Sequence, residues 1–292
     1  MRVAIFGQTI NQESKAYIQL LFDELKTLNA SLCIYADFEA ELQENIAISV
    51  DYEVFDSYQN LDPTLDLMFC IGGDGTILKA ATLVRDLNIP ILGINTGRLG
   101  FLANVAKSDV QKTIAQLQSG AYRIEDRALI SIENKSETFG ELNFAVNEVT
   151  INRKDTTSMI SVHVELDDAY LNTYWADGLI VSTPTGSTGY SLSCGGPIIM
   201  PGSNNMVITP IAPHNLNVRP LVIDDKHELT IQVSGREDEY LIGLDSRIHT
   251  LKLGAEIKLK KADFSLKMLI PEDHDYPSTL RNKLLWGLDK RN

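Results

Sequence analysis

The sequence contains little cysteine and no long apolar run. Its three cysteines, Cys33, Cys70 and Cys194, are far apart and form no CxxC pair, and an odd number argues against a disulfide framework. Cys33 and Cys70 lie in apolar stretches, so we expect both to be buried. No apolar stretch approaches the roughly 20 residues of a membrane helix, and the N-terminus becomes polar too soon for a signal peptide. We therefore expect a cytoplasmic protein that does not bind membranes.

Positive charge is also scarce. The chain has 26 Lys and Arg residues against 39 Asp and Glu residues, a formal net charge of −13. Nucleic acids and anionic membranes are bound by clustered Lys and Arg, so this balance argues against both kinds of partner. A small basic site for an anionic small molecule remains compatible with it.

Several familiar catalytic and nucleotide motifs are missing. The chain has neither GxxxxGK[ST] nor GxGxxG, and its five histidines lack the spacing of metal ligands. No Ser/His/Asp or Cys/His set can be argued, and we predict no metal site built from protein side chains alone. Any nucleotide chemistry must therefore use a different phosphate cradle.

The most informative segment that is present is a glycine-rich turn with an acid inside it. An apolar strand at residues 67–71 leads into Gly72-Gly73-Asp74-Gly75-Thr76, after which a helix is expected. Glycines allow backbone N–H groups to approach an anion, and a helix start adds partial positive charge. An acid in such a cradle is unfavourable in a plain turn. It becomes sensible where the site holds phosphates with a metal ion and also needs a base.

The first 120 residues alternate strand and helix patterns. The expected strands are residues 3–6, 32–35, 65–71 and 89–94. The expected helices are 18–28, 76–87 and 108–120, the last with Ser108 as N-cap and Gly120 as its stop. Alternation of this kind indicates a parallel sheet covered by helices, in which ligands bind beyond the carboxyl ends of the strands.

After about residue 122 the pattern becomes that of strands. Apolar and polar residues alternate over 160–166, and further short strands follow with turns between them. A last helix is expected at 279–288. We predict a Rossmann-like α/β domain with a parallel sheet over 1–122, a mostly β nucleotide-binding domain over 123–271, and a C-terminal segment, 272–292, that packs back on the first domain.

Three further segments carry candidate chemistry, each with a plain structural alternative. The loop 95–102 contains Arg98, which suits a phosphate but can equally be solvated. Asn147-Glu148 places two polar residues inside an apolar strand, either facing a ligand or solvated at a strand edge. Residues 176–193 are rich in hydroxyls and glycines, for a nucleotide or for a turn that caps a helix.

Taken together, these segments resemble the NAD kinases. That family combines a GGDG turn, an Asn-Glu pair and a D-G-L-I-x-S-T-P-T-G-S-T motif in this order, found here at Gly72–Thr76, Asn147-Glu148 and Asp177–Thr188. Gly195-Gly196-Pro197 also follows as in the family, and the similarity spans roughly residues 1–275. The GGDG turn alone also occurs in lipid kinases and phosphofructokinases.

The resemblance implies transfer of the γ-phosphoryl group of ATP, or of another donor, to the 2′-hydroxyl of the adenosine ribose of NAD. It implies Asp74 as general base, Mg²⁺ or another divalent metal with ATP, and a homodimer or homotetramer. The residues that match cofactor or substrate contacts of the family are Gly72, Gly73, Asp74, Gly75, Lys79, Asn147, Glu148, Asp177, Thr188, Gly189, Tyr190, Ser193 and Arg247.

Three positions depart from the family pattern. Gly189 stands where Ala is usual, Trp175 where several members have a basic residue, and Arg247 where Gln is common. Two alternative functions share parts of the pattern. A lipid or sugar kinase would explain the turn but not residues 177–193, and a non-catalytic NAD or NADP sensor would be expected to lack Asp74.

Overall fold

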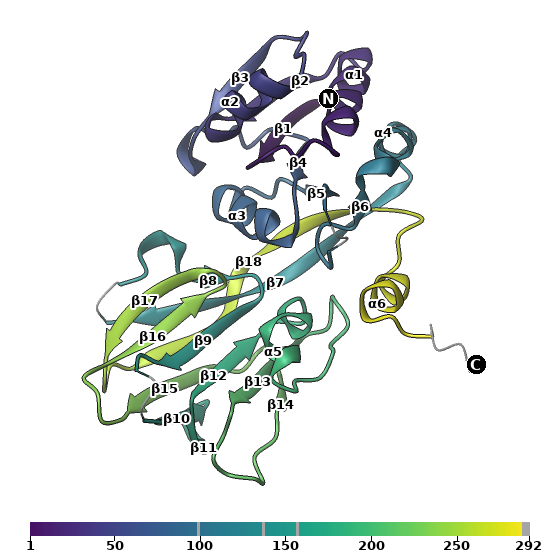
Figure 1. Cartoon of the computed structure of the whole chain (residues 1–292). Coiled ribbons are helices and arrows are strands. Elements are labelled where there is room, and N and C mark those ends of the chain that lie inside the picture. Colours follow the sequence, from purple (N-terminus) through teal and green to yellow (C-terminus); the bar gives the residue numbers. More distant parts are fainter. Residues whose placement is uncertain (98–99, 136–137, 156–157, 288–292) are drawn as a thin grey trace. The chain divides into compact units, whose positions relative to one another are not determined.

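The structure, a computed structural model, describes residues 1–97, 100–135, 138–155 and 158–287 (Figure 1). The chain divides into two compact units. The first comprises Met1–Asp126 with Leu266–Asn292, and the second comprises Arg127–Ser265. The predicted fold class, an α/β domain with a parallel sheet and a mostly β domain, is confirmed.

The first unit is built on a parallel sheet with the strand order β5-β4-β1-β2-β3. The short strand β6 also pairs with β5, as does Met268 of the long strand β18. A sheet covered by helices on both faces requires apolar strands, which explains why β1, β4 and β5 are almost wholly buried. The bounds are β1 (Arg2–Gly7), β2 (Ser31–Tyr35), β3 (Tyr52–Phe55), β4 (Leu67–Ile71), β5 (Ile91–Asn95) and β6 (Val105–Ala106).

The helices of this unit follow the apolar periodicity of the sequence, with shifted ends. They are α1 (Lys15–Thr27), α2 (Ala36–Asn45), α3 (Asp74–Val84), α4 (Val110–Ser119) and α6 (Tyr276–Leu284), with 3₁₀ turns η1 (Tyr58–Asn60) and η2 (Lys107–Asp109). The prediction of Ser108 as N-cap of α4 was wrong, because a 3₁₀ turn precedes the helix and Asp109 takes that place. Gly120 ends α4 in the left-handed conformation, as predicted. The predicted end of the last helix, residue 288, lies outside the described residues.

The second unit packs two antiparallel sheets around one apolar core. One sheet has the order β14-β13-β12-β9-β16-β17, and the other contains β11, β10, β15 and the first part of β18. The strands are β7 (Tyr122–Asn134), β8 (Phe144–Ala145), β9 (Glu148–Arg153), β10 (Ile160–Leu166), β11 (Ala169–Ala176), β12 (Gly178–Ser182), β13 (Asn205–Ile211), β14 (Leu221–Asp224), β15 (Leu229–Ser234), β16 (Glu239–Leu244), β17 (Arg247–Lys252) and β18 (Ile257–Pro271). Short helical turns are η3 (Gly140–Leu142), η4 (Gly186–Thr188) and α5 (Tyr190–Ser193).

Two features of composition can be checked directly. Cys33 and Cys70 are buried free thiols, as predicted, and burial raises the pKa of Cys33 to about 11. Over the described part of the chain, none of the helices has the length and apolar character needed to cross a membrane.

Candidate active site

The glycine turn lies at the point of the parallel sheet where the strand order reverses. After β1 the chain adds β2 and β3 on one side, and then β4 and β5 on the other. Gly7, the last residue of β1, is paired with Ile71, the last residue of β4, so the turn that follows β4 lies beside the end of β1. Such a reversal opens a crevice at the carboxyl ends of the strands, where open α/β sheets bind ligands.

The carboxylate of Asp74 is held by three consecutive backbone N–H groups. Phe101 N–H donates to Oδ2 at 2.8 Å, while the N–H groups of Leu102 and Ala103 donate to Oδ1 at 3.0 and 2.9 Å. The acid that seemed out of place beside a phosphate site is therefore bound by a separate set of N–H groups, which belong to the loop after β5. Oδ2 accepts one of these bonds and Oδ1 two, so Oδ2 keeps more capacity to accept a further hydrogen bond.

The glycines around Asp74 have different physical reasons. Gly72 has φ +154°, and a Cβ there would lie 2.2 Å from Thr76 Oγ1. A Cβ at Gly100 would lie 1.8 Å from Asp74 Oδ1, so this glycine makes room for the carboxylate. At Gly73 and Gly75 a Cβ would meet no atom of the described chain within 4 Å. These two glycines leave open space at the start of α3, as an anion cradle requires.

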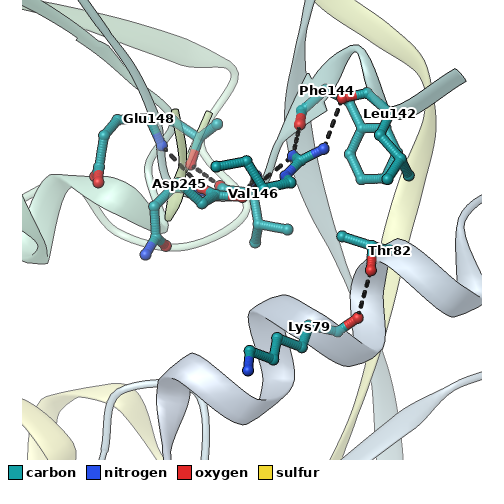
Figure 2. A network of polar contacts seen from close by, with 10 residues as sticks. Lys79, Thr82, Leu142, Phe144, Val146, Glu148 and Asp245 are labelled. Atoms are coloured by element: carbon teal, nitrogen blue, oxygen red, sulfur yellow. Dashed lines mark hydrogen bonds and ion pairs between the residues drawn. The ribbon is translucent and has the colours of Figure 1, made fainter. Parts of the chain in front are cut away.

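Lys79 lies on the exposed face of α3, five residues beyond Asp74. Its carbonyl accepts a hydrogen bond from Thr82 Oγ1 at 2.8 Å (Figure 2). Within the described part of the chain, its ammonium group has neither a hydrogen-bond acceptor nor an ion-pair partner. It is therefore a free cation about one and a half turns from the glycine turn. Arg98, which was also expected near phosphate, lies outside the described residues.

The sequence pattern predicted one continuous strand through Asn147 and Glu148, and this prediction was wrong. A bend at Val146-Asn147 separates β8 from β9, and Glu148 is the first residue of β9. Glu148 is only 8% exposed, whereas Asn147 is half-buried. The interpretation as a solvated strand edge is therefore wrong for Glu148.

Glu148 is a buried acid with an oxygen that lacks a partner. Burial, and then the negative charge of Asp245, raise the pKa of its carboxyl to about 7, although a contact with the backbone N–H of Tyr190 opposes this rise. Its Oε2 and the hydroxyl of Ser182 have no hydrogen-bond partner among the described residues. The two residues are directly paired across β9 and β12, so their side chains share one face of the sheet. Unpaired buried oxygens at one place indicate that a ligand or water completes them.

The hairpin tip between β16 and β17 holds the segment that carries Asn147 and Glu148. Asp245 accepts hydrogen bonds from the N–H groups of Val146, Asn147 and Glu148 at 3.0, 2.7 and 3.3 Å (Figure 2). Burial nevertheless raises the pKa of Asp245 above its usual range. Sequence reasoning missed this residue, because nothing local marks an aspartate that binds a backbone about 100 positions away.

Arg247 binds backbone carbonyl groups just before the same segment. Its guanidinium donates to the carbonyl of Leu142 at 2.6 Å and to that of Phe144, and lies 5.3 Å from the centre of the Phe144 ring. Burial lowers the pKa of Arg247, while Asp245 opposes this change. In this structure the arginine is thus committed to the backbone around η3 and β8, and a ligand contact from it remains a prediction.

The hydroxyl-rich segment sorts into two sets. Thr183, Ser187 and Ser191 are buried and satisfied internally, through Val146 O at 2.7 Å, Pro184 O at 2.6 Å and Thr209 Oγ1 at 2.8 Å. These support the alternative of a structural turn. Tyr190 and Ser193 are exposed and Thr188 is half-buried, so the other set can reach a ligand.

The structure brings the Asn-Glu pair and the hydroxyl-rich segment together. Thr183 N–H donates to Asn147 O at 2.9 Å, and a Cβ at Gly186 would lie 2.0 Å from that oxygen. A Cβ at Gly189 would lie 3.1 Å from Glu148 Oε2. The departure from Ala at position 189 therefore gives the Glu148 carboxyl extra room.

Asp177 lies at the other end of the same strand pair. Ser182 is paired with Glu148, but Gly178, the residue after Asp177, is paired with Asn152. Four residues of strand separate these ends by roughly 13 Å. Asp177 forms an ion pair with Arg153 at 3.1 Å. Trp175 nearby is 46% exposed and lies against the ring of His214, with 4.3 Å between ring centres.

No protein-built metal centre is visible over the described ranges: no three His, Cys, Asp or Glu side chains are grouped so as to hold a metal ion. Mg²⁺ typically keeps several waters and is bound through one or two carboxylates together with substrate phosphates. An open glycine cradle next to one carboxylate fits a metal carried in this way by the phosphate chain.

Comparison with known proteins shows the family to which the chain is related. The model of the ATP-NAD kinase N-terminal domain matches residues 3–122, and that of the C-terminal domain matches residues 146–270. NAD kinases of Flavobacterium psychrophilum and Bacteroides fragilis are 50% and 41% identical to the chain, and each alignment covers 100% of both sequences.

Solved structures agree on the fold. A yeast NADH kinase complexed with NADH has a TM-score of 0.86 at 21% identity, covering 98% of this chain and 88% of that one. An NAD kinase from Archaeoglobus fulgidus in complex with ATP has a TM-score of 0.74 at 23% identity, covering 98% and 99%.

These matches decide what the GGDG turn alone left open, namely whether the acceptor is NAD, a lipid or a sugar. The protein is a phosphotransferase that phosphorylates NAD with ATP. With both domain models matched and relatives at this identity along its whole length, the chain belongs to the NAD kinase family.

Proposed function

We propose that Asp74 is the general base that prepares the 2′-hydroxyl of the adenosine ribose of NAD for phosphorylation. The observation that carries this assignment is the fixed carboxylate, with three N–H donors on it and capacity left on Oδ2. Oδ2 takes the proton of the hydroxyl, the oxygen attacks the γ-phosphorus of ATP, and the bond to the β-phosphate oxygen breaks to release ADP. Such a reaction depends mainly on positioning and on charge neutralisation.

The start of α3 is assigned to the phosphates of the donor. Gly73 and Gly75 leave space there, and the first N–H groups of a helix have no partner within the helix. We assign Mg²⁺, or another divalent metal, to the phosphate chain, where it neutralises the charge that develops on the transferred group. Lys79 supplies one more positive charge close to this turn.

The second unit is assigned to NAD. Glu148, Ser182 and the accessible residues Thr188, Tyr190 and Ser193 offer oxygens and a ring to the dinucleotide, and Asn147 precedes Glu148 in the bend. Asp177 and Arg247 are retained as predicted contacts. We also propose a homodimer or homotetramer in the cytoplasm, where free buried thiols such as Cys33 and Cys70 are usual.

Asp74→Asn tests the base. Loss of a general base typically lowers the rate by 10²–10⁴, so kcat should fall by about that factor. The dissociation constant of NAD, measured by calorimetry, should stay within a few-fold. Near-normal turnover in this variant would exclude Asp74 as the base.

The Asn amide also places an N–H where the carboxylate accepts one, so a loosened loop must be distinguished from a lost base. The melting temperature serves as this control. If it and NAD binding collapse along with kcat, the side chain is structural, and the assignment fails.

A further inference from the structure

The side chain of Phe101 connects the carboxylate of Asp74 to the C-terminal helix. Phe101 is the residue whose N–H donates to Asp74 Oδ2, the oxygen assigned to take the proton. Its ring contacts two side chains of α6, the last helix of the described chain (Figure 1). The ring centre lies 6.5 Å from that of Tyr276 and 5.6 Å from Lys283 Nζ. Both distances are within the range of aromatic pairs and cation–π contacts.

The three N–H donors of Asp74 are not equally fixed. Leu102 and Ala103 are buried, and the carbonyl of Ala103 accepts a hydrogen bond from Asn95 Nδ2 at 3.3 Å. Their N–H groups are therefore held by the core of the first unit. Phe101 is only half-buried. The position of its N–H depends on what holds its side chain, and that support comes from α6.

One face of α6 meets this ring. Tyr276 and Lys283 are seven residues apart, which is two turns of an α-helix, so both side chains project from the same face. Thr279 and Leu280, on the turn between them, are buried. A helix of nine residues is too short to persist in isolation, so α6 depends on this packing.

The start of α6 is anchored in the same unit. The carboxylate of Asp275 caps the helix by accepting from Ser278 N–H at 2.7 Å. The guanidinium of Arg123, at the beginning of β7, donates to the carbonyl of His274 at 3.0 Å. The helix therefore offers the Phe101 ring a fixed support.

We propose that α6 positions the base: Tyr276 and Lys283 hold the ring of Phe101, and through it the N–H that orients Asp74 Oδ2. This inference rests on the proposed function, since it requires Asp74 to be the base. Tyr276 and Lys283 are positioning residues, because they act through Phe101 rather than on a substrate. The C-terminal helix, which lies outside the sequence motifs, thereby takes part in turnover.

Tyr276→Ala removes the ring contact. Misplacing a catalytic group by about 1 Å can cost up to about 10²-fold in rate, so we expect kcat to fall about tenfold. The KM values for ATP and NAD should stay within about twofold, because no group assigned to either substrate is changed. Tyr276→Phe keeps the ring and should restore kcat to nearly the wild-type value.

A double-mutant cycle with Asp74→Asn separates positioning from general destabilisation. If Tyr276 acts through the Asp74 carboxylate, Tyr276→Ala should lower kcat about tenfold in the wild type but change the residual kcat of Asp74→Asn little. Lost stability would instead lower both by the same factor. Melting temperatures of the four proteins show whether each is folded at the assay temperature.

Lys283→Met tests the second contact with less risk to the fold, because methionine keeps most of the apolar stem. A cation–π contact at a partly exposed site is weak, so kcat should fall about two- to fivefold with both KM values unchanged. Arg281→Met is the matched control, since Arg281 is an exposed cation in the same last turn of α6. This control should keep the wild-type kcat.

Two results would overturn the proposal. A wild-type kcat in both Tyr276→Ala and Lys283→Met would show that Phe101 does not need α6. Equal losses in the wild-type and Asp74→Asn backgrounds would give α6 a purely structural role. The base itself is judged by the kcat of Asp74→Asn alone, so a failed base assignment and a failed positioning role are distinguishable.

Discussion

Asp74 occupies the first turn of α3, where helix geometry favours a bound anion. Its own carboxylate turns instead to the N–H groups of residues 101–103, which leaves the start of the helix open for phosphates. In the proposed mechanism the two segments therefore have different tasks: the glycine turn accommodates the donor phosphates, and the loop after β5 orients the carboxylate of Asp74. A base that is oriented before the substrate binds lowers the entropy cost of reaching the transition state.

Gly100→Ala should disturb the base without touching a substrate. A Cβ at this position would lie 1.8 Å from Asp74 Oδ1, so the carboxylate must move. We expect kcat to fall at least tenfold, and the free energy of unfolding to fall by about 1–3 kcal/mol, as for other overpacked sites. Gly97→Ala is the matched control, since its Cβ would meet no described atom within 4 Å. Equal melting temperatures and kcat values for the two variants would contradict this account.

Glu148 should make NAD binding depend on pH. Its pKa is raised to about 7, so the carboxyl is mostly neutral at pH 6 and mostly ionised at pH 8. An ionised carboxylate accepts hydrogen bonds from hydroxyl groups more strongly than a neutral acid does. The KM for NAD should therefore fall several-fold between pH 6 and pH 8, and Glu148→Gln should remove this dependence. A wild-type KM that is flat over this range would refute the contact.

The same group should affect stability with the opposite sign. A pKa raised on folding gives a contribution that is present below the ordinary value of 4.5 and lost as the pH rises through about 7. Glu148→Gln should therefore raise the melting temperature more at pH 8 than at pH 5. Thermal unfolding at both pH values measures the difference, and a difference that does not change with pH would argue against a raised pKa.

At the scale of elements, sequence patterns predicted the structures that depend on residues close together in the chain. The β4–turn–α3 unit, the apolar face of helix α1 and the end of α4 at Gly120 follow from the spacing of apolar residues and glycines, and all are present. The bend at Val146-Asn147 could not be predicted in this way. It depends on Asp245, whose partners lie about 100 residues earlier and become neighbours when β9 pairs with β16.

The site shows the same division. The motifs singled out Asp74 and Glu148 as candidates, but they did not indicate the N–H groups of residues 101–103 that hold Asp74 or the hairpin that holds Glu148. Backbone donors carry no signature in the sequence, since every residue except proline has one. The backbone partners of a candidate side chain are therefore harder to predict than the candidate itself.

The hairpin between β16 and β17 should position Asn147 and Glu148. Asp245→Asn replaces one acceptor oxygen by an N–H donor that faces other N–H groups, so a buried donor loses its partner, at about 1–3 kcal/mol. We expect the KM for NAD to rise about tenfold or more and kcat to change less. Removing the charge of Asp245 also lowers the pKa of Glu148, so the midpoint of the pH dependence should move below 7.

That shift in midpoint separates positioning from general destabilisation, which would leave the pH profile in place. Arg247→Lys should weaken the same segment from its carbonyl side, because an ammonium cannot match the fork that reaches Leu142 and Phe144. Lys252→Gln, at the exposed far end of β17, is the matched control. An NAD affinity that is the same in Asp245→Asn as in this control would contradict a positioning role.

At the scale of the whole molecule, two long strands connect the units. β7 begins at Tyr122 in the first unit and continues into the second, and β18 returns from the second to the first. The returning segment is fixed there by Glu272 N–H, which donates to Ala121 O at 3.0 Å, and by Asp273, which accepts from Gln116 at 2.7 Å. The chain therefore passes twice between units, each of which carries part of the proposed chemistry.

The position of Asp177 leads to a prediction about assembly. Asp177 and Glu148 lie at opposite ends of the strand pair β9–β12, five residue steps and so roughly 16 Å apart along the strands, yet both are expected to contact NAD. Either one extended dinucleotide reaches both ends within a chain, or Asp177 serves the site of a second copy. The predicted homo-oligomer makes the second arrangement possible. At a two-fold interface each chain presents the same residues to its partner, so each Asp177 could reach the other chain's site.

Mixed oligomers distinguish these arrangements. Asp74→Asn and Asp177→Ala chains are each expected to be nearly inactive, and they are refolded together at equal amounts. If Asp177 acts on the partner's site, half of the dimers are mixed and each has one site with both carboxylates, so activity should recover to about a quarter of wild type. Light scattering confirms that the mixture has the wild-type mass. Activity that stays at the level of the separate variants, in oligomers shown to be mixed, would place both carboxylates in one chain.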